Sequence, residues 1–191
     1  MGPIAMQDAD ALVTAEQVLA DPRYRSCEVW DGIAVIKEPS GGWAPYVTMR
    51  LARRLVEHVE TRGLGWVGGP DVGFLLRRSP DRVLSPDLAF VRGNRMAAPP
   101  ARGFAEVVPD FVVEVRSPEQ SERELLQRGL LWSSHGVAVV WLVEPDGSRI
   151  VALHPGAPAR TFVPGDTVRA NPVLPDFAVA IDDLRPSRPP A

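Results

Sequence analysis

The sequence predicts a single α/β domain spanning residues 1–191, in which helices pack on a mixed central sheet. Apolar residues recur every four positions from Val47 to Val59, which is the period of an amphipathic helix. Residues 111–115 form an almost continuous apolar run, which is typical of a strand buried on both faces. A helical segment and a second apolar run at 137–143 follow it. We therefore expect a right-handed strand–helix–strand crossover within the sheet.

Two of the predicted helices carry start signals of their own. Thr14 and Gln17 have the spacing of a capping box, as do Ser121 and Glu124. In this motif the hydroxyl accepts a hydrogen bond from the backbone N–H three residues on. The side chain at that later position in turn accepts one from the backbone N–H of the hydroxyl residue. The pairs predict a short helix ending near residue 21 and a second helix ending near residue 134.

The strands are predicted from short apolar runs between turn-forming residues. Asp31-Gly32 tolerates positive φ and separates residues 27–30 from 33–36, which predicts a tight hairpin. Further strands are expected at 66–67, 73–76, 87–91, 149–153, 161–162 and 177–181, with an irregular loop at 96–105. We expect an ordered core over about residues 13–185 and flexible tails on both sides of it.

Composition narrows the class of protein. The 45% of hydrophobic and 24% of charged residues are ordinary for a soluble globular domain. The single cysteine, Cys27, has no partner for an internal disulfide, and the sequence starts with no signal-peptide pattern, so we expect a cytoplasmic protein that does not enter membranes. A net charge of -3 argues against nucleic-acid binding by overall positive charge and leaves a local basic patch open. Lys37 is the only lysine among 21 basic residues.

Two acidic residues stand out as candidates for chemistry. Asp87 follows Pro86 at the start of a predicted strand, and Glu114 interrupts the apolar run 111–115. Because side chains alternate along a strand, Glu114 and Arg116 share one face. A buried carboxylate is costly unless it is paired or binds a cation. Glu114 therefore indicates either an ion pair with Arg116 or part of a metal site.

The acidic residue after proline, followed by a strand with the pattern E-x-basic, resembles the core of the PD-(D/E)XK nucleases. The longer run from residue 112 to 145 resembles the Uma2-like (DUF820) endonucleases: VVEVRSPEQSERELLQRGLLWSSHGVAVVWLVEP. Further similarity to that family lies in Thr14-Ala15-Glu16, Glu28-x-x-Asp31-Gly32 and Leu174-Pro175-Asp176-Phe177. The resemblance covers nearly the whole chain and implies a restriction-endonuclease-like core.

The resemblance also implies a reaction, the metal-assisted hydrolysis of DNA phosphodiester bonds. Asp87, Glu114 and the backbone carbonyl of Val115 would hold Mg²⁺, or Mn²⁺ in its place, since both are hard cations that take oxygen ligands. Glu28 matches an early glutamate of the family, although a solvated hairpin glutamate is an equal alternative. Gln127 lies on the helix that carries the family's lysine. DNA is the expected partner, and a homodimer is expected by analogy with nucleases that cut two strands.

The chain departs from the family pattern at the lysine. Arg128 occupies the position of the helical lysine, and Arg116 stands two residues after Glu114. Arginine can stabilise phosphate charge but stays protonated and cannot act as a base. Two hypotheses therefore remain. The protein is an active Mg²⁺-dependent endonuclease, or it is a binding module for nucleic acid or protein that keeps the fold without the activity.

Overall fold

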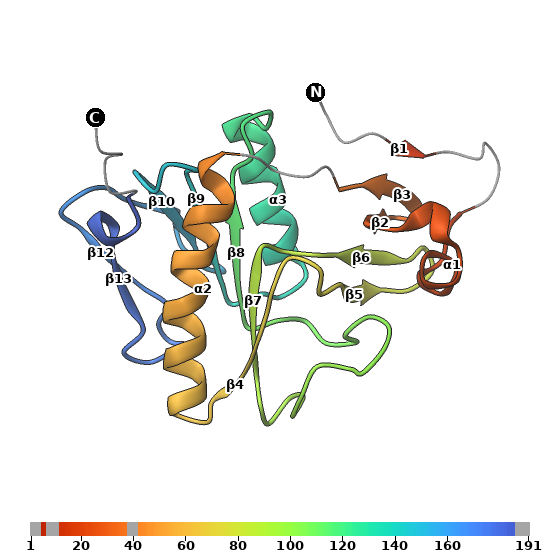
Figure 1. Cartoon of the computed structure of the whole chain (residues 1–191), viewed down its shortest axis with the longest axis horizontal. Coiled ribbons are helices and arrows are strands. Elements are labelled where there is room, and N and C mark those ends of the chain that lie inside the picture. Colours follow the sequence, from red (N-terminus) through yellow and green to blue (C-terminus); the bar gives the residue numbers. More distant parts are fainter. Residues whose placement is uncertain (1–4, 7–11, 38–41, 186–191) are drawn as a thin grey trace.

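A six-stranded mixed sheet forms the centre of the molecule, as predicted (Figure 1). The computed structural model describes residues 5–6, 12–37 and 42–185. The sheet has the order β11-β10-β9-β8-β7-β4. Its strands are β4 (Gly65–Gly68), β7 (Leu88–Arg92), β8 (Phe111–Val115), β9 (Val139–Val143), β10 (Ile150–Leu153) and β11 (Arg160–Phe162). Only β8 and β9 pair in parallel, which confirms the predicted crossover between them.

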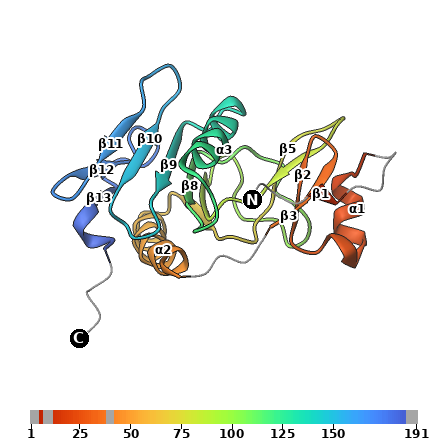
Figure 2. The same ribbon diagram turned by 90° about the horizontal axis from the view of Figure 1, so that it is seen from above.

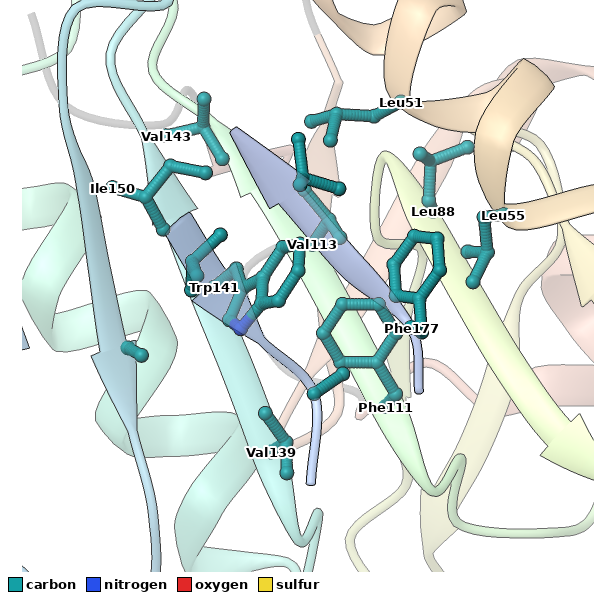
Figure 3. Packing of buried hydrophobic residues seen from close by; sticks show 14 of the residues in the cluster. Leu51, Leu55, Leu88, Phe111, Val113, Val139, Trp141, Val143, Ile150 and Phe177 are labelled. Carbon is teal, nitrogen blue, oxygen red and sulfur yellow. The ribbon is translucent and has the colours of Figure 1, made fainter. Parts of the chain in front are cut away.

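Helices cover both faces of this sheet (Figure 2). Helix α2 (Trp43–Thr61) packs on one face, where Leu51 and Leu55 lie over the side chains of β8 (Figure 3). Helix α3 (Glu122–Ser134) packs on the other face, where Leu125 and Trp132 contact the cluster that contains Val112. Since β8 is buried throughout and its side chains alternate, Glu114 points to the α3 face.

A second, antiparallel sheet lies beside the central one. Its order is β1-β3-β2-β6-β5, formed by β1 (Ala5–Met6), β2 (Cys27–Trp30), β3 (Ile33–Ile36), β5 (Phe74–Arg77) and β6 (Arg82–Leu84). Helix α1 (Ala15–Ala20) and the 3₁₀ turn η1 (Pro22–Tyr24) adjoin it. The predicted hairpin is confirmed, with φ of 55° at Asp31 and 80° at Gly32. The sequence did not reveal β6, whose three residues are too few for a visible alternation.

A two-stranded sheet completes the fold. Strands β12 (Thr167–Arg169) and β13 (Ala178–Ala180) pair with each other, and the 3₁₀ turn η2 (Ile181–Asp183) follows. Phe177, which enters β13, stacks on Trp141 with ring centroids 5.8 Å apart, and it meets Phe111 edge-on (Figure 3). This contact places the two-stranded sheet on the same face of the central sheet as α2.

The helix starts agree with the sequence, whereas the expected tails fall mostly outside the described residues. Both predicted capping boxes form, at Thr14 before α1 and at Ser121 before α3. The expected flexible tails at 1–4, 7–11 and 186–191 lie outside the described residues, whereas Ala5–Met6 pairs with β3 and is not a loose tail. In the described part of the chain, no helix combines the length and the apolar character needed to cross a membrane.

Gly65 is a point where the fold permits no side chain, because its φ is +154° and a Cβ there would collide with the Val91 carbonyl and lie 2.7 Å from the Gly93 nitrogen. We expect Gly65→Ala to lower the free energy of unfolding by about 3 kcal/mol, since backbone atoms cannot move aside. Gly63→Ala is the control, because Gly63 has φ +59° with open space around it. It should cost only about 1 kcal/mol. Equal losses in urea unfolding would contradict this prediction.

Candidate active site

Charged side chains from four parts of the chain meet where the two large sheets join. Glu28 comes from β2, Asp87 from the segment between β6 and β7, Glu114 from β8 and Arg128 from α3. All four line one cavity of about 600 Å³. Leu88 pairs with Val113 where β7 runs antiparallel to β8. Asp87, one residue before Leu88, therefore lies opposite Glu114, one residue after Val113, which explains how these two carboxylates meet.

Arg128 bridges the two glutamates. Its Nη1 and Nη2 lie 2.8 and 2.7 Å from the two carboxylate oxygens of Glu28, and its Nε lies 2.8 Å from Glu114 Oε1. Nη2 also donates to the Ser85 carbonyl at 3.0 Å. The side chains of both glutamates are only 6% exposed, and that of Arg128 is 13% exposed. The glutamates therefore depend on Arg128 for compensation of their buried charge.

Neutral N–H groups also donate to the two glutamates. The Trp30 indole donates to Glu28 Oε2 at 2.9 Å, and the Ser85 backbone N–H donates to Oε1 at 2.7 Å. The Trp132 indole donates to Glu114 Oε1 at 2.6 Å. Trp132 is also a fully buried residue of the core. Spacing could have indicated both tryptophans, since Trp30 lies two residues after Glu28 on a strand and Trp132 lies one helical turn after Arg128.

Asp87 and Glu114 each keep one carboxylate oxygen that no described residue occupies. Asp87 Oδ2 accepts from the Val115 backbone N–H at 2.7 Å, and Glu114 Oε1 is occupied by Arg128 and Trp132. Asp87 Oδ1 and Glu114 Oε2 accept no hydrogen bond from any described residue. Asp87 and Glu114 thus line the same cavity, and each has one carboxylate oxygen that is unoccupied among the described residues.

Burial and neighbouring charges shift the pKa values of this cluster. Burial raises the pKa of Glu114 to about 7 against the attraction of Arg128, and the charge of Asp87 raises it further. Burial also raises the pKa of Asp87, although the hydrogen bond from Val115 opposes the rise. Burial acts on Glu28 in the same direction, but the charge and hydrogen bonds of Arg128 outweigh it and hold the pKa of Glu28 below its usual value.

The structure brings most of the sequence-predicted residues together and leaves one aside. Arg116 does not line the cavity and does not pair with Glu114. Its Nε and Nη2 bind Glu144 at 2.8 and 2.7 Å, and its Nη1 donates to the Gln120 carbonyl at 3.0 Å. Arg116 lies just past the end of β8, so its side chain reaches across to the end of β9.

The other candidates lie at the cavity. Glu28 is buried at its floor and is not a solvated hairpin glutamate. Gln127 is exposed at the rim, and Val115 contributes to the lining. Among the described residues no group of three or more histidine, cysteine, aspartate or glutamate side chains is arranged to hold a metal ion. Any cation at this site would therefore rely on the two carboxylates together with backbone oxygen and water.

Comparisons with known proteins agree with this architecture. A family model described as "Uma2: Putative restriction endonuclease" matches residues 14–182. A crystal structure described as "a putative nuclease belonging to DUF820 from Anabaena variabilis ATCC 29413" superposes with a TM-score of 0.75 at 19% identity. The superposition covers 90% of this chain and 97% of that one, and at this identity it shows a shared fold. No curated protein matches the chain.

Replacing Arg128 should expose the cost of burying the two glutamates. We expect Arg128→Met to lower the free energy of unfolding by about 3 to 5 kcal/mol, because two buried carboxylates lose their cation. Arg116→Met is the matched control, since Arg116 pairs with a single glutamate, Glu144, whose side chain is more exposed than those of Glu28 and Glu114. It should cost about 1 to 2 kcal/mol. Urea unfolding at neutral pH measures both, and a loss for Arg128→Met no larger than the control's would refute the bridging role.

The raised pKa of Glu114 predicts a pH dependence of stability in the metal-free protein. Its folded pKa of about 7 lies above the unfolded value of 4.5, so between these values the folded state holds more protons. The contribution of Glu114 is therefore full below the unfolded pKa and is lost as pH rises through 7. Relative to Glu114→Gln, the wild type should lose up to about 3 kcal/mol between about pH 5 and pH 8. Parallel stability curves for the two proteins would contradict this.

Proposed function

Since the chain belongs to the Uma2 family of restriction-endonuclease-like proteins, we propose that it is a metal-dependent endonuclease that hydrolyses DNA phosphodiester bonds. The observation that carries this proposal is that Asp87 and Glu114 line one cavity, each with one oxygen, Oδ1 and Oε2, that accepts no hydrogen bond from the described residues. A cleft with convergent carboxylates and shifted pKa values is the usual setting of hydrolytic chemistry.

The residues present fit Mg²⁺, or Mn²⁺, in donor type. Both open oxygens are hard anionic ligands, and the cavity has room for the waters that Mg²⁺ retains. Asp87 and Glu114 would hold the ion, and the Val115 carbonyl is a third donor implied by the family pattern. When bound, the ion would supply an activated water and offset the charge that develops on the phosphate.

The protein's own groups prepare the carboxylates for this task. Arg128 and Trp132 both occupy Glu114 Oε1, which leaves Oε2 without a donor among the described residues. Burial raises the pKa of Glu114 to about 7 in spite of Arg128, and Oε2 is the oxygen that can carry the proton, since Oε1 already accepts two donors. Arg128 itself cannot take up a proton, because the glutamates hold its pKa far above the usual value in spite of burial. Proton acceptance at this site falls to Asp87 and Glu114.

A second candidate function is supported by Arg128. The guanidinium binds both oxygens of Glu28 and one oxygen of Glu114, which is the arrangement expected of a site that stabilises the fold without cutting. Such a protein would hold nucleic acid in the same cavity without hydrolysing it. Measurements of binding and cleavage on the same preparation separate the two functions.

Cleavage should depend on the two open carboxylates. We expect the wild type to nick supercoiled plasmid DNA with Mg²⁺ or Mn²⁺, and Asp87→Asn and Glu114→Gln each to slow nicking by at least about 10²-fold, because each removes a charged ligand. Glu144→Gln is the matched control, since Glu144 is also an arginine-paired glutamate at a strand end but lies outside the cavity. It should nick at the wild-type rate.

Two results would count against the proposal. Nicking that survives Glu114→Gln would exclude the metal centre, because the reaction would then ignore one of its two charged ligands. Binding of plasmid without nicking, under both Mg²⁺ and Mn²⁺, would support the binding module in its place.

A further inference from the structure

Lys37, the only lysine of the chain, reaches the candidate active site from the five-stranded sheet. It directly follows β3 and lines the same cavity as Asp87 and Glu114. Its Nζ donates to the carbonyl oxygens of Pro70 and Ser85, each at 2.9 Å. The Ser85 carbonyl is also the one that Arg128 Nη2 contacts. Two cations therefore meet on a single carbonyl, two residues before Asp87.

Two of the three donors of the Lys37 ammonium are committed to groups in the described part of the chain. A lysine ammonium has three N–H groups, and two of them are directed to carbonyls. The third has no acceptor among the described residues. The charge of Lys37 acts on Asp87, since it opposes the rise that burial causes in the pKa of that carboxyl. A donor with full positive charge is thus available beside one of the open carboxylates.

The other cations that line the cavity are committed elsewhere. Arg128 directs Nε to Glu114, Nη1 and Nη2 to Glu28, and Nη2 also to the Ser85 carbonyl. Arg82 places Nη1 against His135 at 3.0 Å and Nη2 against Asp31, and its Nε, which has no partner among the described residues, is buried and closed to an incoming anion. Within the described part of the chain, Lys37 is therefore the cavity cation with the best donor for an incoming anion.

We propose that Lys37 is a catalytic residue whose free N–H binds a non-bridging oxygen of the DNA phosphodiester at the Asp87–Glu114 pair. This inference rests on the proposed function and identifies the group that contacts the phosphate. The two open carboxylates would repel a phosphodiester, and a positive donor beside them offsets that repulsion. Lys37 neither gains nor loses a proton in this role. It supplies the ammonium that Arg128 does not provide from α3.

A purely structural role for Lys37 makes a different prediction. If the ammonium only ties the Pro70 and Ser85 carbonyls together, its removal should lower stability and leave the folded protein's response to DNA unchanged. The two roles separate when DNA binding and cleavage are measured under conditions in which every variant is shown to be folded by circular dichroism.

The single lysine makes a direct spectroscopic test available. Protein grown with ¹³C- and ¹⁵N-labelled lysine reports on Lys37 alone. We expect its Cε resonance to shift when a short DNA duplex is added with Ca²⁺, in the wild type and in Glu144→Gln alike. If the tryptophan indole resonances respond to the duplex and the Lys37 resonance does not, contact between Lys37 and the phosphate is ruled out.

Kinetics of the variants provide the second test. We expect Lys37→Met to lower the single-turnover rate of plasmid nicking by about 10²-fold, as for loss of one charge-stabilising donor. Lys37→Arg should recover at least about tenfold of that loss, because a guanidinium also binds phosphate. Arg160→Met, which removes an exposed cation on β11 outside the cavity, should leave the rate unchanged.

The outcomes distinguish this inference from the proposed function. Wild-type nicking that Lys37→Met does not slow would overturn the role of Lys37 and leave the endonuclease in place. A duplex-induced shift of Lys37 in a protein that never nicks would support phosphate binding and overturn the endonuclease. A protein that neither nicks nor shifts Lys37 would overturn both.

Discussion

The bridge from Arg128 to Glu28 and Glu114 is the interaction on which the rest of the site depends. It ties a helix to a strand of each large sheet, and it does so through charges that are almost fully buried. Two carboxylates in such surroundings would be strongly destabilising alone, and one guanidinium, with its planar set of donors, can satisfy both. A lysine at the same position carries all of its N–H donors on one nitrogen, so it could not reproduce the contacts that the three guanidinium nitrogens make with both glutamates. The arginine is therefore a structural choice as well as a departure from the family's pattern.

Strand pairing then determines which carboxylate oxygens remain available. The register of β7 on β8 sets Asp87 opposite Glu114, and alternation along β8 turns Glu114 to the α3 face. Arg128 and Trp132 take up one oxygen of Glu114, and the Val115 N–H takes up one oxygen of Asp87. What is left is one open oxygen on each residue. The rigid elements that bury the charges thus also orient the atoms that would bind a cation.

Features set by local sequence were predictable, and features set by distant contacts were not. The capping boxes, the Asp31-Gly32 hairpin and the buried strand β8 depend on neighbours along the chain, and all of them form as predicted. Strands β6 and β12 have three residues each, too few for a periodic signal. We expected Arg116 to lie beside Glu114 because alternation along a strand puts both side chains on one face. Alternation does not predict where the strand ends, and the chain leaves the sheet at Arg116. The contact between Glu28 and Arg128 joins positions 100 residues apart, so only the folded topology reveals it.

The same limit explains why Lys37 was not identified from its sequence position. A search for the family's lysine is directed to the α3 helix, where Arg128 stands, whereas Lys37 lies on another sheet and meets the site through the Ser85 carbonyl. Arg128 and Lys37 would then each take one of two roles that a single helical lysine would otherwise combine. Arg128 is committed to compensating buried charge, and Lys37 is held by two carbonyls with one donor left over among the described residues. If Lys37 contacts the phosphate as proposed, loss of the helical lysine does not by itself imply loss of activity, because the donor to the phosphate would come from a different element.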